Sequence, residues 1–522
     1  MNSMVRTLTA CLVLGITTSL SPAQSSAPPT PSAAPPAQSP TTLQVESQIV
    51  LLDVSVTDAR GKPVTDLRPE EFRITEQNLP QTIASFEPPT AHAMPAATAD
   101  KVIVNSTADL GKIGEAPITI FILDELNMSF PDRAYARTKL LQWLARQPSV
   151  LPQPTALLAI NDTDLHLLRD FTQDRDALLS VLNKHSGDVV WRYDSNGRTG
   201  EQASQNMAET LGAIERVSQA MRGVPGRKNV LWVGDGFPPV NMSDVGRTTA
   251  NEISTNLRHL SSVMLHARVT LSIAGPTLKG HQPVTIETQS DSDMMSSGGY
   301  DGLNISQGGI AFSGLAPPTG GRAYQNRNDL DGEIAESIAA GSSYYTLSYR
   351  PTNPSNNPKA YRRIRVTVTR PGLTVQTRNG YFEEPAQTAT PAKIPTAQLA
   401  FDLNGAAISP LAFTDLHLTA ERDGRGNFTL HATARDLTWH DLPDGRRHAD
   451  VVLLAACLSP RGKLLAKSFA TLGSNTEASL ASIAISSAAL PMHVAAPPGT
   501  ARIRFVARDL TSGRVGTVDI TP

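Results

Sequence analysis

The chain has 522 residues, with 46 lysines and arginines against 48 aspartates and glutamates, and a formal net charge of −2 at pH 7. A chain this close to neutral has no electrostatic attraction for nucleic acid or for an anionic membrane surface, so neither is expected as a partner. Cys11 falls in the leader described next, which leaves Cys457 alone and excludes an intramolecular disulfide and a thiolate zinc site. A mature chain of about 500 residues predicts three or four domains.

Residues 1–23 have the layout of a secretory signal peptide. A positively charged start precedes an apolar stretch at 8–20, and Ser21 and Ala23 place small residues at the −3 and −1 positions of a cleavage after Ala23. The apolar stretch is about 13 residues long, shorter than the roughly 20 needed to cross a bilayer, which favours a cleaved signal over a membrane anchor. A lipid anchor at Cys11 is disfavoured because this cysteine lies inside the apolar core. Since no later segment has a transmembrane pattern, we expect a secreted or periplasmic protein with no membrane-spanning segment after signal cleavage.

Two kinds of segment follow the leader. Residues 24–41 are rich in Pro, Ala and Ser and have no apolar period, which predicts a linker. Across residues 42–90 apolar side chains alternate with period two, as at Val50 and Leu52, which predicts a small N-terminal β module. A second stretch rich in Pro and Ala, at about 88–108, predicts a spacer.

Residues 110–350 alternate apolar runs with helical patterns. The runs are typical of strands buried on both faces of a parallel sheet, and they fall at 117–123, 155–160, 229–233 and 269–273. Between them, apolar residues recur every three or four positions, as in amphipathic helices. Residues 276–313 are rich in Gly, Ser, Asp and Met and predict a long loop insertion. The pattern favours an α/β fold with a doubly wound, mostly parallel sheet.

The last third of the chain returns to period two. Residues 351–385 predict a β extension, and a Pro-, Ala- and Thr-rich stretch at 386–397 predicts a linker. Residues 398–522 contain many short β-like segments separated by turn dipeptides, which favours a C-terminal β-sandwich. Cys457 lies in an apolar run of this region, so we expect a buried strand residue rather than a nucleophile.

An ordered series of short motifs runs through residues 45–385. The motifs are LLDVSVTD (51–58), FILDELN (121–127), GRKN (226–229), WVGDGFP (232–238), TGGRA (319–323) and YYTLSY (344–349). In this order they resemble the bacterial exported VWFA-related family, described mainly from acidobacteria, whose central domain has the von Willebrand factor A fold. The resemblance implies a von Willebrand A-like domain at 110–350 and a role in binding.

The resemblance also implies a metal-ion-dependent adhesion site at the carboxyl ends of the sheet strands. Its first loop has the pattern Asp-x-Ser-x-Ser, because a hard divalent cation takes oxygen ligands. Here Asp124 matches the aspartate, but Leu126 and Met128 occupy the two serine positions and cannot ligate. Asp235 matches the later acidic position, and Asn127 offers an amide oxygen beside Asp124.

Two interpretations of this loop remain open. In the first, Asp124, Asn127 and Asp235, with help from the Ser129 hydroxyl, hold Mg²⁺ or Ca²⁺ weakly. The threonine of the adhesion site has no clear match, although Thr172 and Thr199 fit the loop order. In the second, which we favour, no cofactor binds, and Asp124 and Asn127 accept hydrogen bonds from loop amides at the strand end.

Catalytic motifs are not evident. The sequence lacks a Gly-x-Ser-x-Gly elbow, a His-Glu-x-x-His pair and a phosphate-binding Gly-x-x-x-x-Gly-Lys loop. We therefore expect an exported protein-interaction or adhesion-type binding module without enzymatic activity, whose partner is a protein or an extracellular polymer. Two alternatives remain: a metal-dependent adhesin that uses the degenerate ion site, and an enzyme with an unrecognised site.

Overall fold

A computed structural model of the chain describes residues 49–95, 103–162, 164–185, 200–237, 240–241, 247–276, 309–324, 329–352, 360–383, 396–424, 426–476 and 486–522. The predicted signal peptide and the linker at 24–41 lie outside these residues. So do Thr199, most of the predicted insertion at 276–313 and most of the linker at 386–397. Among the described helices, none is long and apolar enough to cross a membrane.

A six-stranded sheet lies at the centre of the region 110–350. Its strands, in spatial order, are β12 (Ala323–Tyr324), β10 (Val269–Ala274), β8 (Lys228–Val233), β5 (Ile118–Asp124), β6 (Val150–Ile160) and β7 (Leu165–Asp174). Neighbouring strands are parallel except β7, which runs antiparallel to β6. β5 and β8 are buried at every residue because helices cover both faces.

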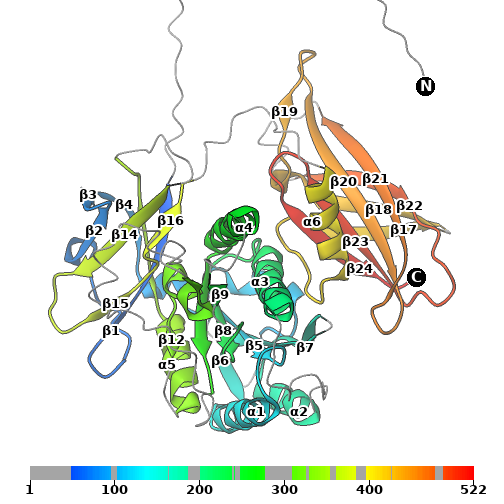
Figure 1. The fold of residues 1–522 in the computed structure, drawn as a ribbon. Helices are drawn as coiled ribbons and strands as arrows, with labels where there is room; N and C mark the ends of the chain where they lie inside the picture. Colours follow the sequence, from blue (N-terminus) through cyan, green and yellow to red (C-terminus); the bar gives the residue numbers. More distant parts are fainter. Residues whose placement is uncertain are drawn as a thin grey trace, which may run out of the picture. The chain divides into compact units, whose positions relative to one another are not determined.

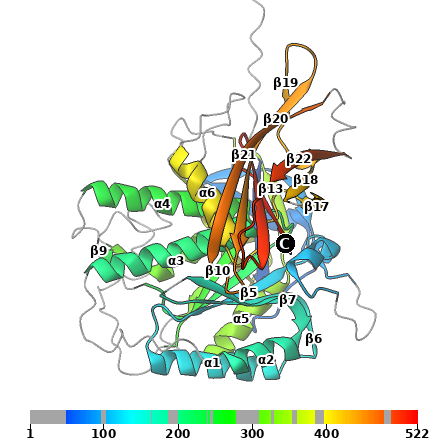
Figure 2. The same cartoon turned by 90° about the vertical axis from the view of Figure 1, so that its right-hand side faces the viewer.

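Alternate side chains of β5 enter two separate cores. Ile120 and Ile122 pack with α3 (Gly200–Ala220) and α4 (Arg247–His266). Phe121 and Leu123 pack with α1 (Phe130–Ala145), α2 (Arg175–Lys184) and α5 (Leu330–Ser342). Successive side chains of a strand point to opposite faces, so the two helix groups lie on opposite sides of the sheet, as Figure 2 shows.

The N-terminal strands and the strands around residues 345–382 form two antiparallel sheets. One contains β15 (Thr374–Gln376), β1 (Val50–Thr57), β13 (Tyr345–Tyr349) and β4 (Ile83–Glu87), in that order. The other contains β16 (Gly380–Phe382), β14 (Tyr361–Val368), β2 (Phe72–Glu76) and β3 (Leu79–Gln81). Apolar side chains from both sheets share one core, in which Phe72 and Tyr345 meet edge to face. Segments at opposite ends of this part of the chain therefore fold as a single β structure.

The C-terminal region has one helix and two antiparallel sheets. A three-stranded sheet consists of β17 (Leu418–Gly424), β18 (Asn427–Thr433) and β22 (Ser487–His493). A five-stranded sheet consists of β19 (His440–Asp441), β20 (Arg447–Leu458), β21 (Leu464–Thr476), β23 (Arg502–Asp509) and β24 (Val515–Ile520). The sheets pack through a shared core that includes Phe428 and Phe505. Helix α6 (Thr396–Ile408) contacts β20 and β23 of the five-stranded sheet (Figure 1).

The predicted fold class, an α/β chain with a doubly wound and mostly parallel sheet flanked by small β modules, is wrong. The described chain contains more strand than helix, and every described sheet except the six-stranded one is antiparallel, including the short pair β9 (Val240–Asn241) and β11 (Gly309–Ile310). The six-stranded sheet is itself mixed. The prediction gave most weight to the apolar runs of 110–350 and underestimated the flanking strands, whose partners lie hundreds of residues away.

Candidate functional site

Asp124, the first residue of the predicted ion site, ends β5 with a fully buried carboxylate. Its Oδ1 accepts hydrogen bonds from the Asn127 backbone N–H at 2.8 Å and from Asn127 Nδ2 at 3.0 Å. Its Oδ2 accepts from Trp232 Nε1 at 3.0 Å, from the Gly236 backbone N–H at 2.9 Å and from Asn127 Nδ2 at 3.1 Å. Burial raises the pKa of Asp124, and these donors act against that rise. Both carboxylate oxygens are therefore already bound by N–H groups.

The other predicted ligands are also engaged. Asn127 Oδ1 accepts a hydrogen bond from Asn206 at 3.2 Å, and Asn127 Nδ2 lies 3.2 Å from the Thr210 hydroxyl. Ser129 is the N-cap of α1 and bonds Asp132 through its hydroxyl at 2.6 Å. Asp235 is exposed, and its carboxylate lies against Gly275, where an added Cβ would come within 2.2 Å of Oδ1.

The positions that carry serine in an adhesion site are part of the cores. Leu126 is buried on the α3 and α4 side of the sheet, and Met128 is buried on the opposite side. The hydroxyl of Thr172 bonds Asn105 at 3.1 Å and accepts from the Asp174 backbone N–H. The structure thus brings Asp124 and Asn127 together as a hydrogen-bonded pair that ties the loop after β5 to the loop after β8.

Replacing Asp124 with asparagine tests this interpretation. The NH2 group that replaces one carboxylate oxygen in asparagine cannot accept hydrogen bonds, so the buried N–H donors to that oxygen lose their acceptor. We expect the free energy of unfolding to fall by about 2 to 3 kcal/mol, as measured by urea unfolding followed by tryptophan fluorescence. The exposed Asp235→Asn variant serves as the control and should change stability by less than about 0.5 kcal/mol. Equal losses in the two variants would contradict the assignment of Asp124 to loop organisation.

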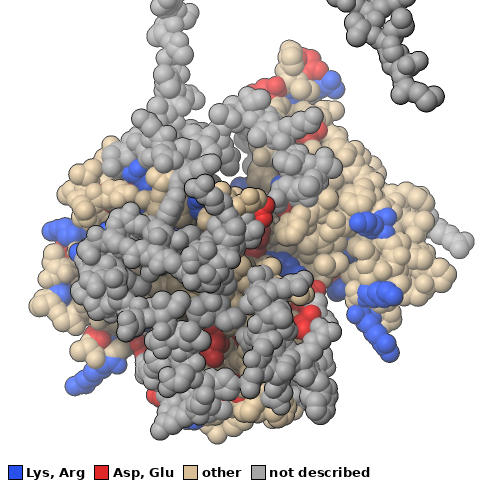
Figure 3. All heavy atoms as spheres, viewed as in Figure 1, with Lys and Arg blue, Asp and Glu red and all other residues tan. Residues whose placement is uncertain are grey.

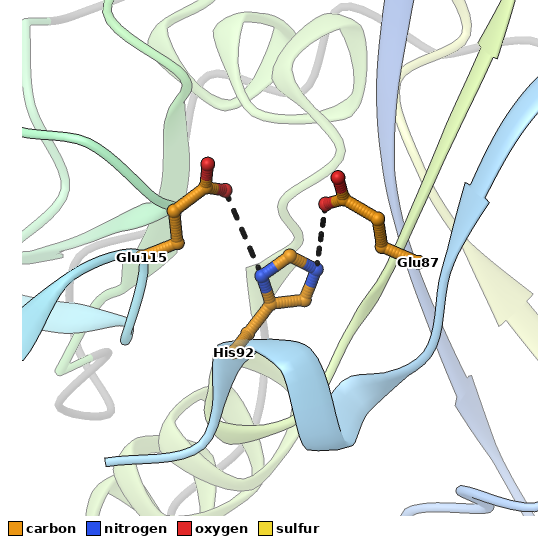
Figure 4. A group of neighbouring side chains, drawn as sticks. All are labelled: Glu87, His92 and Glu115. Atoms are coloured by element: carbon orange, nitrogen blue, oxygen red, sulfur yellow. Dashed lines mark ion pairs between the residues drawn. The ribbon is translucent and has the colours of Figure 1, made fainter. Parts of the chain in front are cut away.

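A second group of ionisable side chains was not predicted from the sequence. Glu87 ends β4, His92 lies in the short 3₁₀ helix Pro89–His92, and Glu115 precedes β5. His92 Nε2 lies 3.6 Å from Glu87 Oε2, and His92 Nδ1 lies 3.7 Å from Glu115 Oε2 (Figure 4). The imidazole is buried, whereas the two carboxylates are 47% and 44% exposed.

Arg268 adjoins this group and connects it to Asp53. Its Nη1 bonds Glu115 at 2.9 Å, and its Nη2 bonds Asp53 at 2.6 Å. The ring of His92 stacks on Tyr344, with centroids 4.3 Å apart, and its Nε2 lies 3.0 Å from the Thr346 hydroxyl. Burial together with the nearby Arg268 charge lowers the pKa of His92, which favours the neutral imidazole.

Sequence reasoning missed this group because nothing in its spacing signals a site. Glu87 and Glu115 lie on either side of the stretch at 88–108 that the composition assigns to a spacer, and His92 lies within it. The pairing of β4 with β13 places Glu87 beside Thr346, whose hydroxyl contacts His92, a proximity that the spacing of these residues does not indicate. A lone histidine inside a Pro- and Ala-rich stretch was the one available signal.

Comparisons with known proteins add little. No family model matches the chain, and no curated protein matches it in sequence. Among solved structures, a glycosyl hydrolase family 2 member from Bacteroides cellulosilyticus is similar over 34% of this chain and 20% of that chain, with 10% sequence identity and a TM-score of 0.11. A TM-score this low carries no argument about fold or activity. The resemblance to the VWFA-related family stays a prediction.

Proposed function

We propose that this chain is an exported binding protein without enzymatic activity, and that its C-terminal β region captures an extended segment of a partner protein along strand β21. The single observation that carries the proposal is the outer edge of β21. This strand has 13 residues and pairs with β20, and no strand among the described residues pairs with its other edge. An unpaired strand edge presents a row of N–H and C=O groups to which another chain can bind.

The composition of β21 supports a binding role for this edge. Proteins that keep an edge strand free commonly protect it with charges, prolines or bulges. β21 contains no proline, and Lys467 is its one charged residue. In Figure 3, the right-hand part of the surface, over the C-terminal region, is largely uncharged apart from several groups of Lys and Arg side chains. A register irregularity lies near the start of β21, between Leu464 and Ala466, and beyond it the edge has a single charge and no proline to prevent strand addition.

Exposed apolar side chains lie next to the edge. Leu465 and Phe469 belong to β21 and are 39% and 52% exposed. Lys467, between them, contacts Asn404 of α6 through its ammonium group at 3.1 Å. Phe401 and Ile408 lie three residues before and four residues after Asn404, hence on the same helix face, and both are exposed. These four apolar residues, Phe401, Ile408, Leu465 and Phe469, form the edge patch.

The edge and the edge patch together define the partner segment. Main-chain hydrogen bonds to β21 would supply affinity, and alternate apolar side chains of the bound segment would cover the edge patch. The predicted signal peptide at 1–23 supports export. Adhesion through a metal at Asp124 has less support, because N–H donors already bind both oxygens of that carboxylate.

Peptides selected from a displayed library on the full chain test the proposal. We expect selected peptides to alternate apolar and polar residues, and we expect Phe469→Lys to weaken their binding at least tenfold, which corresponds to about 1.4 kcal/mol. The control is Leu79→Lys, which places the same charge on an exposed leucine of another edge strand, β3. Equal affinities for the native chain and Phe469→Lys, or equal losses in both variants, would contradict the proposal.

A further inference from the structure

We propose that Glu87, His92 and Glu115 form a binding site for one divalent metal ion of the zinc type. The three side chains come from three separate segments, and one ligand atom from each lies within 4.8 Å of the other two. An imidazole with two carboxylates is a donor set that suits zinc and related transition metals, and three protein ligands leave a position for water. This site is separate from the edge patch, so the inference does not rest on the proposed binding function.

The strongest single observation is the state of His92 Nδ1. His92 is 3% exposed, and its Nδ1 atom is buried without a hydrogen-bond partner in the part of the chain that the structure describes. A buried polar atom without a partner is unfavourable, and a bound cation would remove that cost. The nitrogen points toward Glu115, whose Oε2 lies 3.7 Å away. Two ligands that each lie about 2.1 Å from a tetrahedral zinc are about 3.4 Å apart, close to this separation.

The other ring nitrogen has the role that a metal-bound histidine needs. His92 Nε2 lies 3.0 Å from the Thr346 hydroxyl, and a proton on Nε2 leaves the lone pair of Nδ1 for the metal. Metal-binding histidines usually donate their second ring N–H to a neighbouring oxygen. Stacking on Tyr344 fixes the plane of the imidazole. The ring is therefore already held in a ligating orientation.

The carboxylates of Glu87 and Glu115 can supply the remaining protein ligands of the metal ion. Glu87 lies at the Nε2 edge of the ring, 3.6 Å away, and its half-exposed side chain has to rotate toward Nδ1 to bind the same ion. Glu115 Oε2 also accepts a hydrogen bond from Arg268, but a carboxylate oxygen has a second lone pair, which can bind the metal. Arg268 is held mainly by Asp53, through hydrogen bonds of 2.6 and 3.2 Å, which leaves the charges of Glu87 and Glu115 to balance the ion.

Titration of the full, chelator-treated chain with zinc chloride tests the site. We expect one ion per chain, with binding weakened at least tenfold in His92→Gln. Cobalt(II) should bind competitively and give visible absorption typical of a low-coordinate nitrogen and oxygen shell. The control is His185→Gln, because His185 also bonds a glutamate, Glu125, at 2.6 Å but belongs to no group of three possible metal ligands among the described residues. That variant should bind zinc as the native chain does.

Two results would overturn the inference: absence of zinc binding in the native chain, and stoichiometric binding that His92→Gln leaves unchanged. If His92→Gln fails to fold, Glu87→Gln answers the same question, because Glu87 is half-exposed and its substitution leaves the buried imidazole in place. Zinc affinity in Glu87→Gln must fall at least tenfold, and native affinity in that variant would also overturn the inference.

Discussion

Replacing Arg268 with methionine is expected to lower the free energy of unfolding by about 3 to 5 kcal/mol. Arg268 bonds Asp53 through two nitrogens and Glu115 through a third, and its guanidinium lies over the ring of Tyr344. Both Arg268 and Asp53 are largely buried, with side chains 17% and 12% exposed. Methionine retains much of the packing volume but leaves the Asp53 carboxylate buried without its main cation. Urea unfolding at pH 7 measures the loss.

The pH dependence of this loss has a defined sign. Burial by itself would raise the pKa of Asp53, but the charge and hydrogen bond of Arg268, together with the charges of Arg227 and Arg378, hold that pKa below its ordinary value of 3.8. A carboxylate with a lowered pKa stabilises the folded state at pH values above its unfolded pKa, and that contribution disappears as the pH falls through the folded pKa. The gap in stability between the native chain and Arg268→Met should therefore be full at pH 7 and should narrow below about pH 4.

An exposed ion pair serves as the control for the buried pair of Arg268 and Asp53. Arg146 bonds Asp331 at 2.7 Å, but its side chain is 59% exposed. Exposed ion pairs contribute little, so Arg146→Met should cost less than about 1 kcal/mol. Similar losses of unfolding free energy in Arg146→Met and Arg268→Met would contradict the importance assigned to the buried contacts between Arg268 and Asp53.

Gly321→Ala is expected to destabilise the chain by about 4 kcal/mol or more. Gly321 lies beside β10, and a Cβ at this position would come within 1.8 Å of the backbone oxygen of Leu271. The obstacle is the backbone of β10, a strand that pairs with β8 on one side and β12 on the other and in which Leu271 is fully buried, so it cannot move aside as a flexible side chain could. Thermal unfolding followed by circular dichroism measures the effect.

Gly314→Ala is the control for this substitution. Gly314 belongs to the short 3₁₀ helix Phe312–Leu315, and no atom lies within 4 Å of a Cβ built there. Its substitution should change stability by no more than about 0.5 kcal/mol. A stable Gly321→Ala variant would show that β12 and β10 do not approach each other as described.

The sequence was most informative where local pattern alone decides structure. The apolar runs at 117–123, 229–233 and 269–273 correspond to the buried strands β5, β8 and β10. Cys457 was predicted to be a buried strand residue, and it lies in β20 with 1% exposure, where burial raises the pKa of its thiol. A continuous apolar run needs no distant partner to be recognised.

Sequence pattern did not predict structure that depends on the pairing of strands far apart in the sequence. β1 pairs with β13, so that Leu52 lies opposite Leu347, and no feature of either segment indicates the other. For this reason the amount of antiparallel sheet was underestimated, and the predicted fold class was wrong. Helix α6 was missed for a different reason: apolar residues such as Phe401, Leu403 and Ile408 surround it on several sides, which hides the helical period.

The candidate sites likewise differ in whether neighbours in the sequence or distant segments bring their residues together. Asp124 and Asn127 were both expected to bond loop backbone amides, and Asp124 does so at Asn127 and Gly236. The Asn127 side chain bonds the side chains of Asp124, Thr210 and Asn206 instead. The grouping of Glu87, His92 and Glu115 depends on three segments meeting, which spacing could not reveal. The edge patch likewise depends on α6 lying beside β21, a contact made by Lys467 and Asn404.

Hydrogen exchange of the full chain, with and without a selected peptide, tests the central claim about β21 most directly. Strand addition satisfies the outward-facing amides of the edge strand, so binding should slow exchange within Leu464–Thr476 and leave the edge strand Leu79–Gln81 unchanged. Protection confined to other segments, with exchange in Leu464–Thr476 unaltered by a bound peptide, would contradict the account.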